Sequence, residues 1–195
     1  MPTILNRPLA AILLFACSPL LLLTALAVLI ALGRPLIFVQ TRAGQGGRPF
    51  GLIKFRTMTA RRDRSGRLLP DAERTPRTGL VVRRTRLDDL LGLLNVVKGD
   101  LAIVGPRPLL PETIARLASA GERRSAVLPG ITGWAQVNGN TLLSDDQKVA
   151  FDLWYVEHRS WRIDAAIVLR TIDVLLRGER MNAKRQPQAA ESGSP

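Results

Sequence analysis

The sequence predicts a small α/β domain that is attached to a membrane by an N-terminal helix. Three observations lead to this prediction. Leu9–Gly33 is a run of 25 residues without a charge, which is long enough for a membrane helix. Strand-like and helix-like patterns then alternate over about 150 residues, enough chain for one hydrophobic core. The net charge of +12 favours anionic partners such as phosphorylated substrates or anionic lipids.

The apolar run, within a predicted membrane segment 1–35, allows two geometries. As a helix it would be about 37 Å long, more than the roughly 30 Å of a hydrocarbon core. Ser18-Pro19 interrupts it near its centre, where proline removes one helix hydrogen bond and leaves a carbonyl that the Ser18 hydroxyl could satisfy. The helix either spans the membrane or bends there and returns to the same leaflet. In both cases the basic residues that follow place the remaining chain in the cytoplasm.

Residues 36–58 predict an extended, strand-rich entry to the domain. Strands are expected at Ile37–Gln40 and Phe50–Met58, separated by the glycine turn Gly44–Gly47. The second strand carries Lys54 and Arg56, which either contact an anion or form a solvated strand face. Residues 59–79 are polar and basic and predict a mobile loop with at most a short helix.

The segment 83–111 determines the functional interpretation. A basic run leads to two adjacent carboxylates, and leucines and valines follow at helical spacing. Thr85-x-x-Asp88 has the form of a capping box, with Thr85 as the N-cap, and Lys98-Gly99 has the form of a helix end. A carboxylate among arginines can attack phosphorus, bind a metal or only cap the helix, and the helix pattern alone favours capping. The residues concerned are Arg83, Arg84, Arg86, Asp88 and Asp89.

The rest of the domain is predicted to be mainly helical. Residues 112–121 have helical spacing, and the charged residues 122–124 predict a solvated surface turn. Residues 130–139 are rich in glycine and amides. Ser144-x-x-Gln147 is a second capping box, which opens a helix to about Glu157.

The C-terminal region predicts one more helix. Trp161–Arg177 is amphipathic and basic, and this pattern fits either a membrane interface or a core-facing helix with a solvated basic face. Residues 182–195 are small and polar and predict a disordered tail. One cysteine, Cys17, excludes an intrachain disulfide or a Cys/His zinc site, and the only histidine, His158, is interpreted as a surface or packing residue.

Five segments, taken in their order and spacing, resemble the monotopic phosphoglycosyl transferases, the bacterial sugar transferase family. The resemblance covers roughly residues 9–176. It is carried by the Ser18-Pro19 break, FVQTRAGQGGRPFGLIKFRTM at 38–58, RRTRLDDLLGLLNVVKGDLAIVGPRPLLPE at 83–112, GITGWAQVNG at 130–139 and LWYVEHRS at 153–160.

The resemblance implies a fold and a reaction. It implies a re-entrant membrane helix bent at Ser18-Pro19, interfacial amphipathic helices, and a catalytic domain (residues 36–181) on the cytoplasmic face of the bacterial inner membrane. It also implies transfer of a phospho-sugar from a nucleotide sugar, here expected to be a UDP-sugar, to polyprenyl phosphate, as the first membrane step of surface glycan synthesis. Asp88 would be the nucleophile of a phosphoaspartyl-sugar intermediate formed with release of UMP, and Mg²⁺ would be held near Asp88 and Asp89.

Four basic residues are expected to contact the substrate phosphates. Phosphoryl transfer depends on positioning and on neutralising phosphate charge. Arg107, held between two prolines, is pre-set for a bidentate phosphate contact, although a buried structural salt bridge is the alternative. The expected substrate-binding residues are Lys54, Arg56, Arg84 and Arg107.

The chain departs from the family pattern at three positions. The family usually has Glu where Asp89 stands, Arg where Asn140 stands and Trp where Asp145 stands. A catalytically impaired family member is therefore one alternative. Another is a membrane-anchored basic module that binds anionic lipid or nucleic acid, but it gives no reason for the paired acids, so no nucleic acid is expected. A homodimer is compatible with the sequence.

Overall fold

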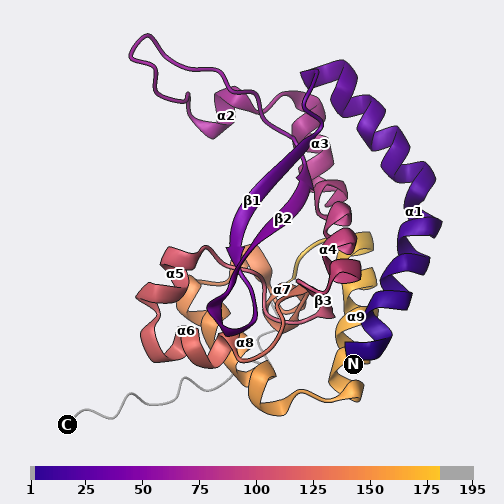
Figure 1. Cartoon of the computed structure of the whole chain (residues 1–195), viewed down its shortest axis with the longest axis vertical. Helices are drawn as coiled ribbons and strands as arrows, with labels where there is room; N and C mark the ends of the chain where they lie inside the picture. The colour runs from indigo at the N-terminus through magenta and orange to yellow at the C-terminus, as the bar shows by residue number, and fades with distance from the viewer. Residues whose placement is uncertain (1–2, 181–195) are drawn as a thin grey trace.

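The computed structural model describes residues 3–180, so the predicted tail at 182–195 lies outside the described residues. The fold is mixed α/β: a long N-terminal helix runs beside a domain of short helices and two small sheets (Figure 1). The helices are α1 (Thr3–Leu32), α2 (Asp71–Arg74), α3 (Arg77–Arg84), α4 (Gly92–Lys98), α5 (Pro111–Arg116), α6 (Ala118–Ser125), α7 (Trp134–Val137), α8 (Asp145–His158) and α9 (Trp161–Arg177). The strands are β1 (Ile37–Ala43), β2 (Pro49–Phe55), β3 (Ala102–Val104) and β4 (Gly130–Thr132), and the 3₁₀ turns are η1 (Gln45–Gly47), η2 (Leu87–Leu91) and η3 (Asn140–Leu142).

Helix α1 continues through Ser18-Pro19 and is bowed along its length (Figure 1). Proline has no N–H, so the carbonyl of Phe15 loses its helical partner. The Ser18 hydroxyl donates to this carbonyl at 2.7 Å, as the sequence predicted it could. By length and composition α1 is apolar enough to cross a membrane, and it is the one such helix within residues 3–180.

Both ends of α1 are bonded to the α/β domain. Near its N-terminus, the side-chain oxygen of Asn6 accepts a hydrogen bond from the Ile103 N–H at 3.2 Å, and Arg7 donates to the carbonyl of Lys98. At its C-terminus, the guanidinium of Arg56 donates to the carbonyls of Leu32, Gly33 and Arg34. Between these ends the helix packs along α4. The helix therefore lies beside the domain over its whole length.

The two predicted strands form an antiparallel hairpin. β1 pairs with β2 in a register that sets Ile37 opposite Phe55 and Ala43 opposite Pro49. Gly46 and Gly47 have φ values of 65° and 74°, a region that glycine enters without steric cost, so the glycine turn is confirmed. β2 ends at Phe55, before the predicted Met58, because its partner strand β1 begins at Ile37, which is paired with Phe55.

The second sheet pairs β3 with β4 in parallel. A Cβ atom on Gly130 would lie 2.1 Å from the backbone nitrogen of Gly105, so this close approach requires glycine. The Gly105 N–H donates to the Thr132 carbonyl at 2.9 Å, and the Gly130 N–H donates to the Pro106 carbonyl at 2.9 Å. These contacts hold the turn that carries Arg107 against β4.

The prediction that an α-helix starts at Thr85 is wrong. Thr85 follows α3 and its hydroxyl donates to the Val81 carbonyl at 2.8 Å, so Thr85 closes one helix rather than capping the next. Arg86 then adopts a left-handed conformation with φ 60°, and the acidic pair lies in η2 instead of an α-helix. The predicted end is confirmed, because Gly99 caps α4 with φ 97°.

The charged segment 122–124 is not a solvated turn. It forms the last part of α6, and Arg124 is buried against Asp152 of α8, with 2.7 Å between guanidinium and carboxylate. The capping box at Ser144 is confirmed, and so are α8 and the bounds of α9.

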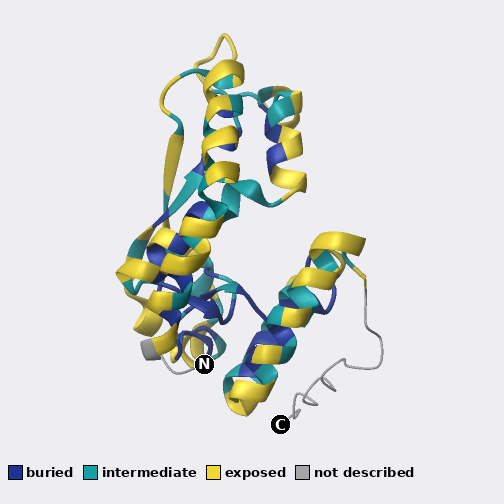
Figure 2. Cartoon of the chain, turned by 90° about the vertical axis from the view of Figure 1, so that its right-hand side faces the viewer, coloured by how far each residue is buried: buried dark blue, intermediate teal, exposed yellow. Residues whose placement is uncertain are grey.

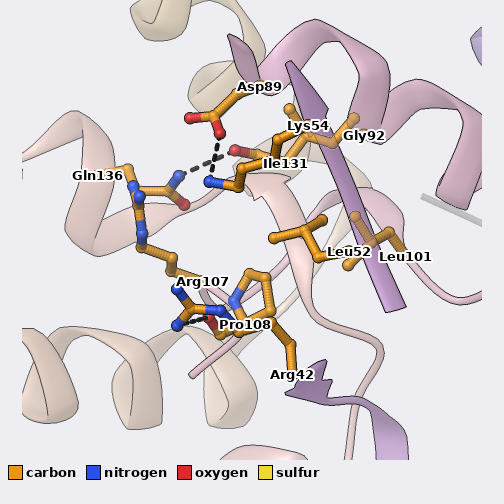
Figure 3. A pocket seen from close by; sticks show the side chains of 11 residues that line it. Arg42, Leu52, Lys54, Asp89, Gly92, Leu101, Arg107, Pro108, Ile131 and Gln136 are labelled. Carbon is orange, nitrogen blue, oxygen red and sulfur yellow. Dashed lines mark hydrogen bonds and ion pairs between the residues drawn. The ribbon is translucent and has the colours of Figure 1, made fainter. Parts of the chain in front are cut away.

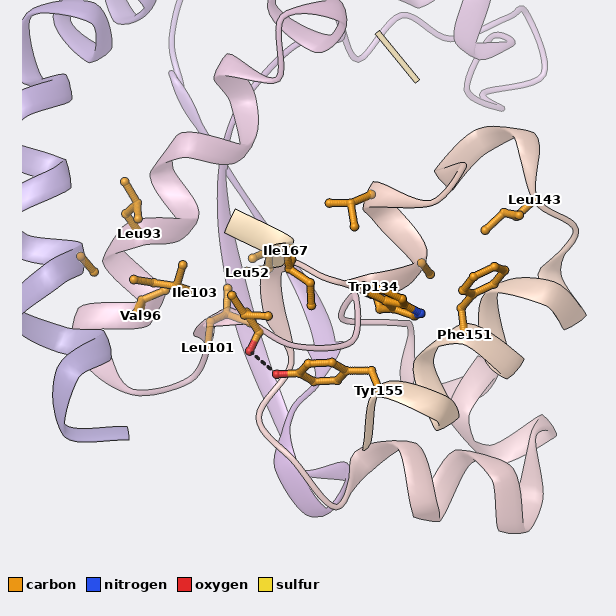
Figure 4. Packing of buried hydrophobic residues seen from close by; sticks show 14 residues of the cluster. Leu52, Leu93, Val96, Leu101, Ile103, Trp134, Leu143, Phe151, Tyr155 and Ile167 are labelled. Carbon is orange, nitrogen blue, oxygen red and sulfur yellow. Dashed lines mark hydrogen bonds between the residues drawn. The ribbon is translucent and has the colours of Figure 1, made fainter. Parts of the chain in front are cut away.

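The main core lies among α4, β3, α7, α8 and α9 (Figure 4). Phe151, Tyr155 and Ile167 are almost completely buried, and the Tyr155 hydroxyl donates to Asp164 at 2.7 Å. Helix α9 therefore has a core-facing side, which agrees with the core-facing alternative given for this helix. Its other side exposes large apolar residues, and Figure 2 shows buried and exposed residues alternating along it. The exposed residues are Trp161, Leu169, Ile172, Leu175 and Leu176.

Candidate active site

A cleft of about 1360 Å³ lies between the β1–β2 hairpin, η2 and the C-terminal end of α9. It contains both predicted catalytic acids and all four predicted substrate-binding cations, which come from three separate stretches of the chain. Pairing of β1 with β2 and packing of β2 against η2 bring these segments together. The six residues that the sequence singled out are Lys54, Arg56, Arg84, Asp88, Asp89 and Arg107.

Asp89 is held by an ion pair. Its carboxylate lies 2.6 Å from the Lys54 ammonium, which reaches it from β2 (Figure 3). Burial alone would raise the pKa of Asp89. The charge and hydrogen bond of Lys54, followed by the charges of Arg107 and Arg86, outweigh burial and hold this pKa below its usual value. Asp89 is therefore ionised at neutral pH and fixed in orientation.

Asp88 has a different environment from its neighbour. Burial, and after it the negative charge of Asp89, raise the pKa of the Asp88 carboxyl, while Lys54 and Arg83 oppose the rise. In the part of the chain that the structure describes, Asp88 has no ion-pair partner within 4 Å. An uncommitted carboxylate that faces a cationic cleft is suited to nucleophilic attack or to metal binding.

The four predicted cations have different contacts. Lys54 pairs with Asp89, and Arg84 is an exposed residue of the cleft wall. Arg56 lines the cleft, but its guanidinium is bonded to the end of α1. The backbone carbonyl of Arg107 accepts a hydrogen bond from the buried Arg124, and its side chain reaches the cleft. The proline-braced turn thus presents Arg107 to the site from a fixed backbone.

A second cavity of about 30 Å³ lies beside Asp89 and Arg107 and is also lined by Arg42 and Gln136 (Figure 3). Arg42 donates to the Gln40 side chain at 2.7 Å and to the Pro108 carbonyl. Gln136 donates to the Ile131 carbonyl at 2.8 Å. Arg42 and Gln136 were not predicted as site residues, although both lie in the motifs that carried the resemblance.

Three further residues meet at the carboxylate of Glu179, a cleft residue that the sequence did not predict. Glu179 follows α9 and forms an ion pair with Arg86. It also accepts hydrogen bonds from the Asn140 side chain at 2.5 Å, from the Thr141 N–H at 3.1 Å and from the Thr141 hydroxyl. These hydrogen bonds hold the pKa of Glu179 below its usual value, against the opposing effect of burial.

The acidic pair is compatible with Mg²⁺. Residues 3–180 contain no group of three or more His, Cys, Asp and Glu residues that could hold a metal ion. Mg²⁺ in phosphoryl-transfer sites is commonly held by one or two carboxylates together with substrate phosphates and waters, so a third protein ligand is not required. Asp88 and Asp89 satisfy this smaller requirement. His158 stacks on Trp154 at an exposed position and is not among the residues that line the cleft.

A family model and individual relatives both place the chain among sugar transferases. The chain matches the family described as bacterial sugar transferase over residues 2–178. It is 45% identical over 171 residues to the uncharacterized sugar transferase EpsL of Bacillus subtilis (strain 168), a match that covers 87% of this chain and 85% of that protein.

Two relatives with more specific names are longer than the matched region. The chain is 39% identical to the UDP-glucose:undecaprenyl-phosphate glucose-1-phosphate transferase of Caulobacter vibrioides, covering 86% of this chain and 66% of the relative. It is 38% identical to the UDP-N-acetylgalactosamine-undecaprenyl-phosphate N-acetylgalactosaminephosphotransferase of Aeromonas hydrophila, covering 83% of this chain and 40% of the relative. The two names specify different sugars, and this chain aligns with them almost equally well.

Proposed function

The chain belongs to the bacterial sugar transferase family, and on this premise we propose that it transfers a phospho-sugar from a UDP-sugar to undecaprenyl phosphate. The observation that carries the proposal is the pair Asp88 and Asp89 in a large cationic cleft beside an apolar helix. A nucleotide sugar and a phosphorylated lipid are both anionic, and one of them is also apolar. A basic cleft next to a membrane helix suits both substrates. Relatives named as undecaprenyl-phosphate transferases make a purely non-catalytic basic module the less favoured alternative.

In the proposed reaction, a carboxylate oxygen of Asp88 attacks the sugar-bearing phosphorus of the donor. The bond from that phosphorus to the bridging oxygen breaks, and UMP leaves with the electron pair. In the second half-reaction, a phosphate oxygen of undecaprenyl phosphate attacks the same phosphorus, and the Asp88 carboxylate is released. Dividing the transfer into two steps lets one site serve a water-soluble donor and then a lipid acceptor.

The neighbouring side chains would neutralise the charge of the phosphates. Lys54 and Arg107 are the cations best placed for this role, because one is oriented by Asp89 and the other by a braced turn. Asp88 and Asp89 would hold Mg²⁺, which would further neutralise non-bridging oxygens when bound. The shorter side chain of Asp89, compared with the family's usual Glu, still reaches Lys54. This contact supports an active enzyme rather than an impaired one.

For the membrane helix we propose the re-entrant arrangement, with residues 36–181 as the catalytic domain on the cytoplasmic face of the bacterial inner membrane. A straight span would carry the N-terminus of α1 away from the domain. The bonds from Asn6 to Ile103 and from Arg56 to the other end of α1 favour a helix with both ends on one side. The exposed apolar residues of α9 support a role for that helix at the membrane interface.

The test is donor-dependent release of UMP. Solubilised protein with Mg²⁺ and undecaprenyl phosphate is offered a panel of UDP-sugars, and UMP is measured. We expect release with at least one donor, and about 10³-fold or greater loss in Asp88→Asn, because the nucleophile is removed. The matched control is Asp63→Asn, which changes an exposed acid of the 59–70 loop. Retention of the full rate by Asp88→Asn would show that the nucleophile is misassigned.

A further inference from the structure

Glu179 ties the C-terminal end of α9 to two distant segments of the cleft wall. Its carboxylate receives the Arg86 guanidinium, the Asn140 amide and both the N–H and the hydroxyl of Thr141. A carboxylate offers about four lone-pair positions, so these four donors fill its capacity. Glu179 is therefore not free to accept a hydroxyl of the sugar, although it lines the cleft.

The contacts of Glu179 are made at unusual backbone positions. Among the described residues three that are not glycine have a positive φ, and two of them are Arg86 (60°) and Asn140 (46°). The left-handed conformation is unfavourable for an L-residue unless its surroundings hold it there, more so for Arg than for Asn. Gly178, with φ 82°, lets the chain leave α9 and turn towards these residues. Glu179 supplies side-chain contacts to both left-handed residues.

Arg86 leads directly into the acidic pair. It is the residue before η2, and its carbonyl accepts a hydrogen bond from the Asp89 N–H at 3.2 Å. The direction in which the turn presents Asp88 and Asp89 therefore depends on the conformation of Arg86. A carboxylate 93 residues later in the chain holds that conformation through the guanidinium.

We propose that Glu179 is a positioning residue for the transfer reaction. It clamps Arg86 against the 139–141 turn, and thereby fixes the start of η2 so that Asp88 and Asp89 face the cations of the cleft. This inference rests on the proposed function for its catalytic consequence. We call the contacts among Glu179, Arg86, Asn140 and Thr141 the Glu179 clamp.

The competing explanation makes an opposite prediction. The same donors could form an anion site that the donor diphosphate enters after displacing Glu179. Removing the carboxylate charge would then free Arg86 and lower the KM for the donor. If the Glu179 clamp is correct, removing the Glu179 charge misplaces the acidic pair and lowers kcat with little change in KM. Displacements near 1 Å can lower the rate of a reaction about 10²-fold.

The first experiment compares Glu179→Gln with wild type in the UMP-release assay. We expect kcat to fall about 10- to 100-fold and the donor KM to stay within about threefold. The matched control is Glu157→Gln, which breaks an exposed Arg–Glu pair with Arg123 outside the cleft, and it should retain wild-type kinetics. An unchanged kcat, or a lower donor KM, in Glu179→Gln would overturn the proposal.

Two further measurements separate the clamp from a general loss of stability. In a double-mutant cycle, Arg86→Gln combined with Glu179→Gln should cost no more than the more damaging single change, because the two residues act as one unit. Hydrogen exchange should quicken in both segments 84–90 and 138–142 of Glu179→Gln, but not elsewhere and not in Glu157→Gln. Additive losses, or exchange unchanged in either segment, would refute the clamp. If wild type releases no UMP, the proposed function fails while exchange still tests the clamp.

Discussion

Asp88 and Asp89 are neighbours in sequence, yet their pKa values are displaced in opposite directions. The charge of Lys54 outweighs burial at Asp89 and lowers its pKa, whereas burial and the charge of Asp89 raise the pKa of Asp88. Opposite shifts in adjacent titratable groups are typical of sites that assign them different roles. One acid is committed to an ion pair, and the other is left as the more basic carboxylate available for attack.

The raised pKa of Asp88 leads to a pH prediction. Attack requires the carboxylate, so activity should be lost as pH falls through the pKa of Asp88 and be full above it. Because this pKa is raised, the acidic limb of kcat/KM should lie above the usual aspartate value of about 3.9. The measurement is UMP release against pH at fixed Mg²⁺, with folding checked at each pH. A rate that stays level to below pH 4 would contradict the assignment.

At the scale of the elements, local patterns predicted those helices whose ends depend on nearby residues. The Ser144 capping box and the amphipathic repeat of α9 are local patterns, so the residues that determine these helices lie close together in the sequence. The start of η2 could not be predicted in this way, because Arg86 is held by Glu179, which lies far along the chain. Arg124 appeared to be a surface residue because its partner Asp152 lies 28 residues later. Both wrong predictions therefore concern residues whose partners lie far away in the sequence.

The same distinction applies to the candidate site. The acidic pair and its cations could be predicted because each lies in a compact motif whose residue types match phosphate chemistry. Arg42, Gln136 and Glu179 could not, because only pairing of β1 with β2, the close approach of β3 to β4, and the turn after α9 bring them to the cleft or to the small cavity beside it. Arg56 shows the converse, since a cation in the right motif is bonded to the end of α1.

The buried pair between α6 and α8 gives a stability prediction. Arg124→Met would leave the Asp152 carboxylate without its partner in the core and would release the Arg107 carbonyl. We expect a loss of about 3–5 kcal/mol in the free energy of unfolding. Arg123→Met, one residue earlier, breaks only an exposed pair with Glu157 and should cost at most about 1 kcal/mol. Thermal unfolding in detergent measures both, and equal losses would contradict the structural role of Arg124.

On the scale of the whole molecule, α1 and the domain behave as one packed unit. The helix packs along α4, its N-terminal end bonds to β3 through Asn6, and its C-terminal end is held by Arg56 of the segment after β2. Strand β2 itself carries Lys54, which orients Asp89. The Lys54–Asp89 ion pair and the hydrogen bonds of Arg56 therefore link the acidic pair to the C-terminal end of α1 through β2 and the residue that follows it.

This arrangement predicts that both ends of α1 face the same side of the membrane. With the only cysteine removed as Cys17→Ser, single cysteines are introduced at Leu5, at Phe15 in the exposed middle of α1, and at Arg180 after α9. A membrane-impermeant maleimide is applied to right-side-out or inverted vesicles. Cysteines at 5 and 180 should react only in inverted vesicles, because α1 returns to the leaflet that it entered, and the lipid-facing cysteine at 15 should react in neither. Reaction of position 5 in right-side-out vesicles, with 180 protected there, would mean that the helix spans. The contacts of Asn6 and Arg7 with the domain could not then exist in the membrane.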